Sequence, residues 1–260
     1  MSLPPEAFWL ALADAADGET MARFRAGTPI DDKLADADGF DPVTEGDRAA
    51  ERAIRALIAE RYPDHAILGE EEGASGTGNH RWVIDPIDGT RAFVAGLPVW
   101  MTLIGLERGG RAVAGLASQP VTGERFLATG DGGARLFRWG TEARALRVSG
   151  RADPAAAIAM TTDPFLFDAE RTERFERVRR ATRLMRYGTD AYAFCALAMG
   201  TVDLVLEAGV QPYDIGALIP IVEAAGGLFT TWDGGRPEAG GSVIASASPA
   251  LHGWALERLA

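Results

Sequence analysis

The residues best suited to do chemistry form the segment Asp85-Pro86-Ile87-Asp88-Gly89-Thr90. The apolar run before it predicts a buried strand that delivers Asp85, and Pro86 should block further pairing because proline has no amide proton. Asp88 follows three residues later, so both carboxylates would lie on one tight turn. Two carboxylates this close repel each other unless a proton or a cation lies between them. Hard oxygen ligands at this spacing suit Mg²⁺.

The residues after Asp88 add a capacity to bind anions. Gly89 and Thr90 should begin a helix, and the first backbone N–H groups of a helix can bind a phosphate. The alternative interpretation is a simple turn, because aspartate before proline is common and Asp88-Gly89-Thr90 fits a helix start. An acid pair at the end of a buried strand has no obvious structural duty, so the whole segment favours a metal site beside a phosphate site.

Hydrophobic periodicity predicts the elements that position this turn. Helical spacing covers residues 5–25, about 47–61, 170–180, 191–199, 214–225 and 249–259, and Thr44 can cap the second of these helices. Extended segments are predicted at 66–68, 81–85, 101–107, 112–119, 125–128, 135–139, 146–148, 155–160, 184–187, 202–206, 228–230 and 243–245. Consecutive strands in the middle, followed by alternating strands and helices, predict a mixed α/β or α+β protein.

Composition sets limits on the function. The 260 residues are 47% hydrophobic and 24% charged, as in ordinary globular proteins. There is no long apolar run or basic signal segment, which predicts that the protein does not span a membrane. The net charge of −11 argues against nonspecific binding of nucleic acid or an anionic membrane. Cys195 is the single cysteine, which suits a reducing compartment, and we predict a cytoplasmic protein.

Several motifs together resemble one family. The segment from Trp82 to Thr90 resembles the W-x-[IV]-D-P-[IL]-D-G-T signature of inositol monophosphatase-like proteins. Four further motifs stand in that family's order: Gly69-Glu70-Glu71, Asp41-Pro42-Val43-Thr44 with Asp47, Gly188-Thr189, and Gln211-Pro212-Tyr213-Asp214-Ile215. The resemblance spans about residues 41–227, and several motifs in register are stronger evidence than one.

The resemblance implies two or three Mg²⁺ ions. Glu70 and Asp85 would bind one ion together with the carbonyl of Ile87. Asp85, Asp88 and Asp214 would bind the second, and a third, looser ion would be drawn to Glu70 through water. Each assignment has a structural alternative: Glu70 belongs to a run of glutamates that is typical of a solvated surface, and Asp214 could cap the helix that it begins.

The resemblance also implies how water is activated. Thr90, with Glu70, would orient the attacking water and help to deprotonate it, and Asp41 would hydrogen-bond to Thr90. The backbone N–H groups of Gly89 and Thr90 would hold the phosphate oxygens. As alternatives, Asp41 could be an ordinary turn residue and Thr90 a helix cap.

Three longer segments resemble the histidinol-phosphate phosphatase branch of the family: residues 88–106, 186–192 and 205–214. They contain Arg91, Asp190 and Glu207, which the resemblance places at the substrate. Histidinol phosphate carries an ammonium group and an imidazole that can protonate near neutral pH, so Asp190 and Glu207 would complement its positive end. Asp190 could instead cap the helix over 191–199. Arg91 would contact the substrate or a neighbouring subunit. In the third segment, Gln211 occupies a position where the branch has lysine about as often.

By this resemblance the fold is a layered αβαβα sandwich in one phosphatase unit. An N-terminal half, about 1–148, would contain an antiparallel sheet, and a C-terminal half, about 149–260, a mixed sheet, with the site between them. The implied activity is hydrolysis of L-histidinol phosphate by in-line attack of activated water, in a homodimer. Alternatives are an inositol-1-phosphatase, a broader sugar-phosphate phosphatase, or an inactive regulatory protein, which the presence of Glu70, Asp85 and Thr90 disfavours.

Overall fold

The computed structural model describes residues 3–27, 29–33 and 42–260. Asp41, predicted to bond to Thr90, lies outside these residues. Within them the strands form sheets of two, eight and five strands. The two-stranded ribbon pairs β1 (Ile30–Asp32) with β2 (Pro42–Thr44) in antiparallel fashion. In this described part, no helix combines the length and the apolar character that crossing a membrane requires.

The eight-stranded sheet belongs to the first part of the chain and has the order β10-β9-β8-β7-β6-β5-β3-β4. It is antiparallel except for the parallel pair β3 and β5. Its strands are β3 (Ala66–Gly69), β4 (Gly73–Ser75), β5 (His80–Asp88), β6 (Met101–Arg108), β7 (Arg111–Gln119), β8 (Glu124–Thr129), β9 (Ala134–Arg138) and β10 (Thr141–Ala145).

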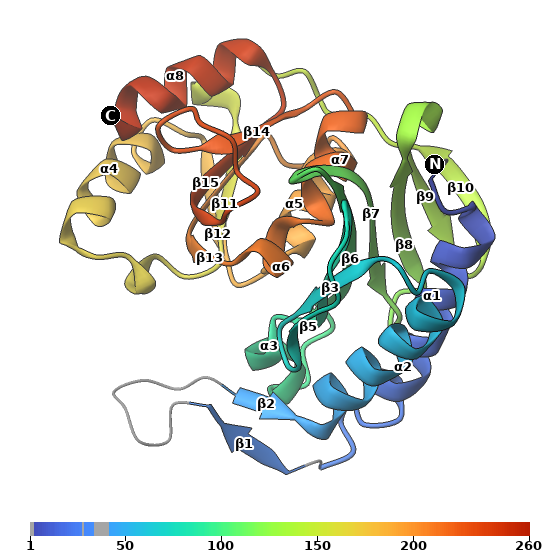
Figure 1. Ribbon diagram of the computed structural model, residues 1–260. Helices are drawn as coiled ribbons and strands as arrows, with labels where there is room; N and C mark the ends of the chain where they lie inside the picture. The colour runs from blue at the N-terminus through green and yellow to red at the C-terminus, as the bar shows by residue number, and fades with distance from the viewer. Residues whose placement is uncertain (1–2, 28, 34–41) are drawn as a thin grey trace.

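Two helices, α1 (Glu6–Met21) and α2 (Glu45–Arg61), cover the outer face of this sheet (Figure 1). Trp9, Leu12 and Ala16 recur at helical spacing on α1 and are fully buried against the sheet. Thr44 caps α2, because its side chain accepts a hydrogen bond from the Gly46 amide. That cap confirms the prediction from the sequence.

The five-stranded sheet has the order β12-β11-β13-β15-β14 and is mixed, with β11 parallel to both of its neighbours. Its strands are β11 (Ile158–Thr161), β12 (Leu184–Tyr187), β13 (Leu204–Val210), β14 (Leu228–Thr231) and β15 (Gly241–Ser246). Helices α4 (Ala169–Arg179) and α8 (Pro249–Leu259) lie on its outer face, and α5 (Tyr192–Ala198), α6 (Pro212–Ile215) and α7 (Leu218–Ala224) lie between the two sheets (Figure 1).

The layers therefore run helix, sheet, helix, sheet, helix, which confirms the predicted αβαβα sandwich. The central helices approach the large sheet closely at two glycines. A Cβ atom on Gly115 would lie 2.1 Å from the carbonyl oxygen of Ala217, and one on Gly105 would lie 2.6 Å from the carbonyl carbon of Gly216. Because these positions lack side chains, the α6–α7 segment can pack directly on β6 and β7 and bring Asp214 to the end of β5.

The elements around the site differ from the prediction in two places. β5 does not end at Pro86 but runs on to Asp88, with a bulge between Asp85 and Asp88 where proline needs no pairing amide. The predicted helix over 214–225 is two short helices, α6 and α7. The bulge matters for the site because it turns both aspartates of β5 toward the helices of the central layer.

Candidate metal and substrate site

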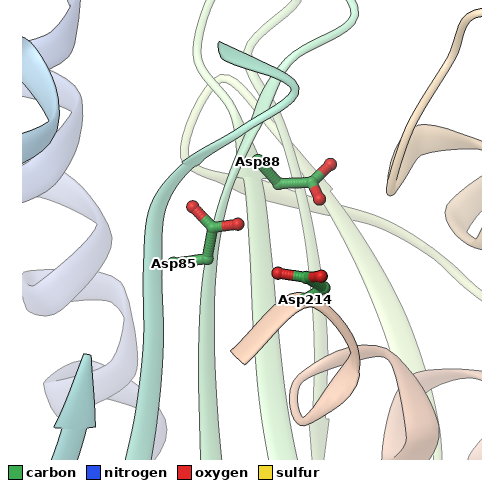
Figure 2. Close-up of side chains that lie close together, drawn as sticks. All are labelled: Asp85, Asp88 and Asp214. Carbon is green, nitrogen blue, oxygen red and sulfur yellow. The ribbon is translucent and has the colours of Figure 1, made fainter. Parts of the chain in front are cut away.

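Three aspartates meet between the end of β5 and helix α6 of the central layer. Asp85 and Asp88 come from the bulged end of β5, and Asp214 comes from α6. One carboxylate oxygen from each lies within 4.8 Å of the others. Figure 2 shows the three side chains pointing into a common space, with Asp214 approaching from the opposite side. The structure thus brings together three of the residues predicted to bind metal.

Backbone amides hold the three carboxylates in place. The Ile87 amide donates to Asp85 Oδ1 (3.0 Å), and the Ala191 amide donates to Asp88 Oδ2 (2.7 Å). The Gln211 amide donates to Asp214 Oδ2 (2.8 Å), which completes a capping box at the start of α6. Asp214 therefore caps its helix and also faces the other aspartates, so the two interpretations of this residue are compatible.

Burial, and after it nearby carboxylates, disfavour the charged form of all three aspartates. Burial and the neighbouring carboxylates of Glu70, Asp88 and Asp214 raise the pKa of Asp85 well above its usual range. The pKa of Asp88 is raised in the same way, first by burial and then by the nearby carboxylates. Burial raises the pKa of Asp214 to about 7.

The donor set fits a hard divalent cation. In the described part of the chain, none of the three aspartates forms an ion pair with a lysine or arginine. Clustered carboxylate oxygens without a cationic side chain are the ligands that Mg²⁺ and similar ions prefer. No paired cationic side chain therefore balances the three carboxylates, although the more distant charge of Lys33 lowers the pKa of Asp214 in part.

Glu70 lies beside this cluster, on the turn between β3 and β4. Its influence on the pKa of Asp85 is second only to burial, which places the two carboxyl groups next to each other. Lys33 Nζ lies 2.9 Å from Glu70 Oε1 and 2.7 Å from Glu71 Oε1. Glu70 thus lies near the aspartates and is paired with Lys33, so the run of three glutamates is not simply a solvated surface. Its role as a further metal ligand stays a prediction.

Thr90 reaches a carboxylate that the sequence analysis did not assign. Its hydroxyl donates to the carbonyl of Ile87 (3.1 Å) and lies 3.5 Å from Asp47 Oδ1. Asp47 is buried, which raises its pKa to about 6 against the opposing effect of hydrogen bonds from Thr44. The signal was present in the sequence, because the spacing of Thr44 and Asp47 is that of a capping box. The bond predicted from Asp41 to Thr90 stays a prediction.

Asp190 faces the same cluster from the segment between β12 and α5. It has a positive φ of 43°, and its carboxyl group packs on Gly89, where a Cβ atom would lie 3.0 Å from Asp190 Oδ2. The N-cap of α5 is Ala191, not Asp190. Burial raises the pKa of Asp190 to about 6, while the positive charge of Arg91 lowers it. Gly89, Arg91 and Asp190 thus lie together beside the aspartates.

Glu207 on β13 is buried and already has hydrogen-bond partners. It accepts bonds from the Thr162 amide (2.7 Å), the Thr162 hydroxyl (2.9 Å) and the Thr161 hydroxyl (3.3 Å). Burial raises its pKa to about 8 despite these donors, and the nearby charge of Asp190 adds to the rise. Its oxygens are largely used within the protein, so Asp190 is the more available of the two predicted substrate carboxylates.

Two cavities meet at Asp190. The smaller, about 220 Å³, is lined by Asp88, Asp190, Glu207 and Asp214. The wider, about 920 Å³, is lined by Arg91 and by several aromatic side chains. Both share Thr162 and Asp190. A small molecule whose anionic end was held at the aspartate cluster by a cation would therefore extend past Asp190 toward the wider cavity.

Comparison with known proteins identifies the scaffold on which this site is built. The sequence model of the inositol monophosphatase family matches residues 7–260. The chain belongs to the inositol monophosphatase family. The family is metal-dependent, and the aspartate cluster is where the described residues could hold a metal ion.

Relatives within this family carry different names. The chain is 40% identical to the "Bifunctional phosphatase IMPL2, chloroplastic" of Arabidopsis thaliana, over 96% of this chain and 73% of the relative. It is also 40% identical to the "Histidinol-phosphatase" of Streptomyces coelicolor, over 93% and 91% of the two chains. A solved inositol monophosphatase from Zymomonas mobilis has a TM-score of 0.85 at 35% identity, over 98% and 97% of the two chains. The family predicted from the motifs is confirmed.

Proposed function

We propose that this chain is a Mg²⁺-dependent phosphomonoesterase that hydrolyses L-histidinol phosphate to L-histidinol and phosphate. The observation that carries the proposal is the position of Asp190, whose carboxylate lines the same cavity as Asp88 and Asp214. A phosphate ester bound at the aspartates would place a nearby ammonium or imidazolium group against Asp190. The relative named histidinol-phosphatase in Streptomyces coelicolor supports this assignment.

The metal ligands in this proposal are those that the resemblance predicted. Glu70, Asp85 and the Ile87 carbonyl would hold one Mg²⁺, and Asp85, Asp88 and Asp214 a second. When bound, such ions lower the pKa of water and neutralise charge on the phosphate and the leaving oxygen. The raised pKa values of the aspartates support the assignment, because burial and neighbouring carboxylates disfavour their charged forms and a bound cation would compensate that charge.

The protein side chains would orient and deprotonate the attacking water. The Thr90 hydroxyl has one proton, which would be donated to Asp47 in place of the Ile87 carbonyl, and its oxygen could then accept a hydrogen bond from the water. Asp47 can accept the proton that this chain of bonds transfers. The amides of Gly89 and Thr90, where α3 (Thr90–Val94) begins, would hold phosphate oxygens. Attack in line with the leaving oxygen then needs no covalent intermediate.

The second candidate is hydrolysis of an inositol or sugar phosphate. The likeness to the Zymomonas mobilis inositol monophosphatase favours it. Both candidates use the same metal and phosphate groups, and they differ only in the organic part of the substrate. A polyhydroxylated ring needs hydrogen-bond acceptors but no negative charge, so the charge of Asp190 is what separates the two.

The test is phosphate release by the purified protein with Mg²⁺, comparing L-histidinol phosphate, inositol-1-phosphate, fructose-1,6-bisphosphate and an aryl phosphate. Asp190→Asn is the informative variant because asparagine tolerates a positive φ. We expect it to lower kcat/KM for histidinol phosphate by roughly tenfold or more, which is the value of one charge-assisted hydrogen bond. The value of kcat/KM for the aryl phosphate should fall much less. Equal losses on both substrates, or a wild-type preference for inositol-1-phosphate, would overturn the substrate assignment.

We also propose that the chain forms a homodimer, as the resemblance implies. The wide cavity beside Arg91 carries apolar side chains that a partner would cover: Leu97 is 53% exposed, Phe165 92% and Tyr187 43%. Exposed large apolar side chains that cluster in this way are typical of interaction surfaces. Light scattering after size exclusion should give twice the chain mass, and a monomer would contradict this part of the proposal.

A further inference from the structure

Glu51 is a fully buried carboxylate that lies close to the metal ligand Glu70. It belongs to α2, which runs along the outer face of the sheet containing β3 and β5 (Figure 1), and its exposed fraction is 0%. Glutamate is almost never fully buried unless its charge is paired. Neither the metal ligation nor the phosphate chemistry described above uses this residue, so its burial needs another explanation.

The partners of Glu51 are the backbone amides that follow Glu70. Glu51 Oε2 accepts a hydrogen bond from the Glu71 amide (2.8 Å), and Oε1 accepts one from the Glu72 amide (3.1 Å). The amide of Glu70 itself donates to the Ile84 carbonyl on β5 (3.1 Å). Glu70 is therefore fixed on one side by the strand that carries Asp85 and on the other by the Glu51 carboxylate.

Gly69, immediately before Glu70, makes room for this arrangement. A Cβ atom at Gly69 would lie 2.0 Å from Glu51 Oε1, so no larger residue fits while the carboxylate stays in place. The glycine of the Gly69-Glu70-Glu71 motif is thus explained by the approach of a side chain from α2.

Arg55 completes the arrangement one helical turn later. Its Nε donates to Glu51 Oε1 (2.7 Å), and its other nitrogens donate to the Ser75 hydroxyl (2.9 Å) and the Gly73 carbonyl (2.5 Å). The guanidinium supplies the charge that allows Glu51 to be buried, and it also ties β4 to α2. The hairpin of β3 and β4, which presents Glu70, is held by two side chains of one helix.

We propose that Glu51 is a positioning residue that sets the affinity of the ion shared by Glu70 and Asp85. Glu51 fixes the turn that carries Glu70, whereas amides from other elements hold Asp85, Asp88 and Asp214. Loss of Glu51 should therefore weaken one ion and spare the other. The inference rests on the metal sites of the proposed function.

The experiment measures Mn²⁺ binding to the metal-free full chain by calorimetry and by the electron paramagnetic resonance signal of free Mn²⁺. Glu51→Gln keeps the size of the side chain but turns an amide N–H₂ toward one of the backbone donors. We expect one Mn²⁺ site to weaken roughly 10- to 100-fold, as for other residues that support a metal ligand, and the other to change less than about twofold. The Mg²⁺ concentration for half-maximal phosphate release should rise in parallel, with turnover regained at high Mg²⁺.

Asp203→Asn is the matched control. Asp203 is also buried and accepts hydrogen bonds from a backbone amide, Ile158, and from an arginine Nε, Arg151, but it does not line the site. A loss of stability without a change in either Mn²⁺ site is expected for it. If Glu51→Gln does not fold, Gly69→Ala is measured instead, because it displaces the Glu51 carboxylate without removing its charge.

The outcomes separate the inference from the proposed function. A wild-type chain that binds no Mn²⁺ would refute the metal-dependent function itself. Wild-type binding of two ions with unchanged affinities in Glu51→Gln would overturn only the role of Glu51. Equal weakening of both sites, or equal weakening in Asp203→Asn, would show that Glu51 acts through general stability.

Discussion

Buried and half-buried carboxylates occur in two kinds of surroundings in this protein. Glu51 and Asp203 each accept hydrogen bonds from backbone amides and from an arginine. Asp85, Asp88 and Asp214 each accept one backbone amide bond, but their charged neighbours are mainly other carboxylates, and Lys33, which pairs with Glu70, only partly offsets them at Asp214. Glu51, Asp203 and Asp85 are buried, whereas Asp88 and Asp214 are half-buried. Because Asp85 is as deep as Glu51 and Asp203 but has different partners, the partners and not the depth distinguish the two groups.

The difference separates carboxylates that stabilise the fold from carboxylates that need a ligand. A buried charge is tolerated when donors and a counter-charge surround it, and it is costly when they are missing. The first group has its counter-charges built into the chain. The second group would gain them only from a bound cation, and such binding to the folded state adds stability by mass action. Mutations should therefore have opposite consequences in the two groups.

Asp85→Asn should give the largest effect on activity. Asp85 is the proposed ligand shared by both ions, so its loss should lower kcat/KM by at least roughly 10³-fold, about 4 kcal/mol of transition-state stabilisation. Removing one charge from the cluster also relieves repulsion, so the melting temperature in EDTA should stay the same or rise. Steady-state kinetics and calorimetric melting measure the two quantities. Retention of substantial Mg²⁺-dependent turnover would remove Asp85 from the metal site.

Asp203→Asn should show the reverse pattern. Its partner Arg151 is partly exposed and can regain water, so we expect a loss of about 2 kcal/mol in the free energy of unfolding, below the full cost for a closed buried pair. Turnover per folded molecule should not change. Urea titration followed by circular dichroism gives the first quantity, and kinetics at a temperature well below melting gives the second. A stable Asp203→Asn protein with reduced turnover would break the comparison.

Asp47→Asn tests a carboxylate that belongs to both groups. Asp47 caps α2 through Thr44 and also lies within reach of Thr90. We expect roughly a tenfold fall in kcat, since one step of general base catalysis is worth at least that much. Thr44→Ala is the control, because it removes a cap worth about 1 kcal/mol and leaves the carboxylate in place. If both variants lost turnover equally, Asp47 would act only through the helix.

The sequence predicted best what is local. Asp85 and Asp88 lie on one segment, so their proximity followed from spacing alone, and the Thr44 cap followed from its position before a periodic helix. Asp214 and Glu70 are distant along the chain, and only the order of motifs connected them to the cluster. The structure adds the physical link: Gly105 and Gly115 let the α6–α7 segment approach the large sheet.

Glu51 shows what the sequence could not reveal. Its spacing from Ile54 and Ile58 puts position 51 on the buried face of the helix, but a glutamate in a helix with many charged residues is ordinarily expected to be solvated. Its role depends on the turn after β3, which packs against α2 only in the folded chain. The same holds for the bulge in β5, because Pro86 predicts the end of a strand and only the neighbouring strand shows that pairing resumes at Asp88.

The smallest predicted effect is the pH dependence of stabilisation by Mg²⁺. The pKa of Asp214 in the folded protein is about 7, above its ordinary value of 3.8. The neutral carboxyl group therefore stabilises the folded state fully below pH 3.8, and this stabilisation is lost as the pH rises through 7. Once the aspartates are ionised, a bound cation supplies the positive charge that the protons supplied at lower pH. Saturating Mg²⁺ should therefore raise the melting temperature more at pH 8 than at pH 5.5. The difference should be roughly 2–4 °C for each kcal/mol that the bound ion adds to the free energy of unfolding. Scanning calorimetry measures the shift, which Asp85→Asn should reduce and Asp203→Asn should leave intact. A shift that is the same at both pH values would mean that the aspartates of the site are already balanced by other charges, as Glu51 and Asp203 are.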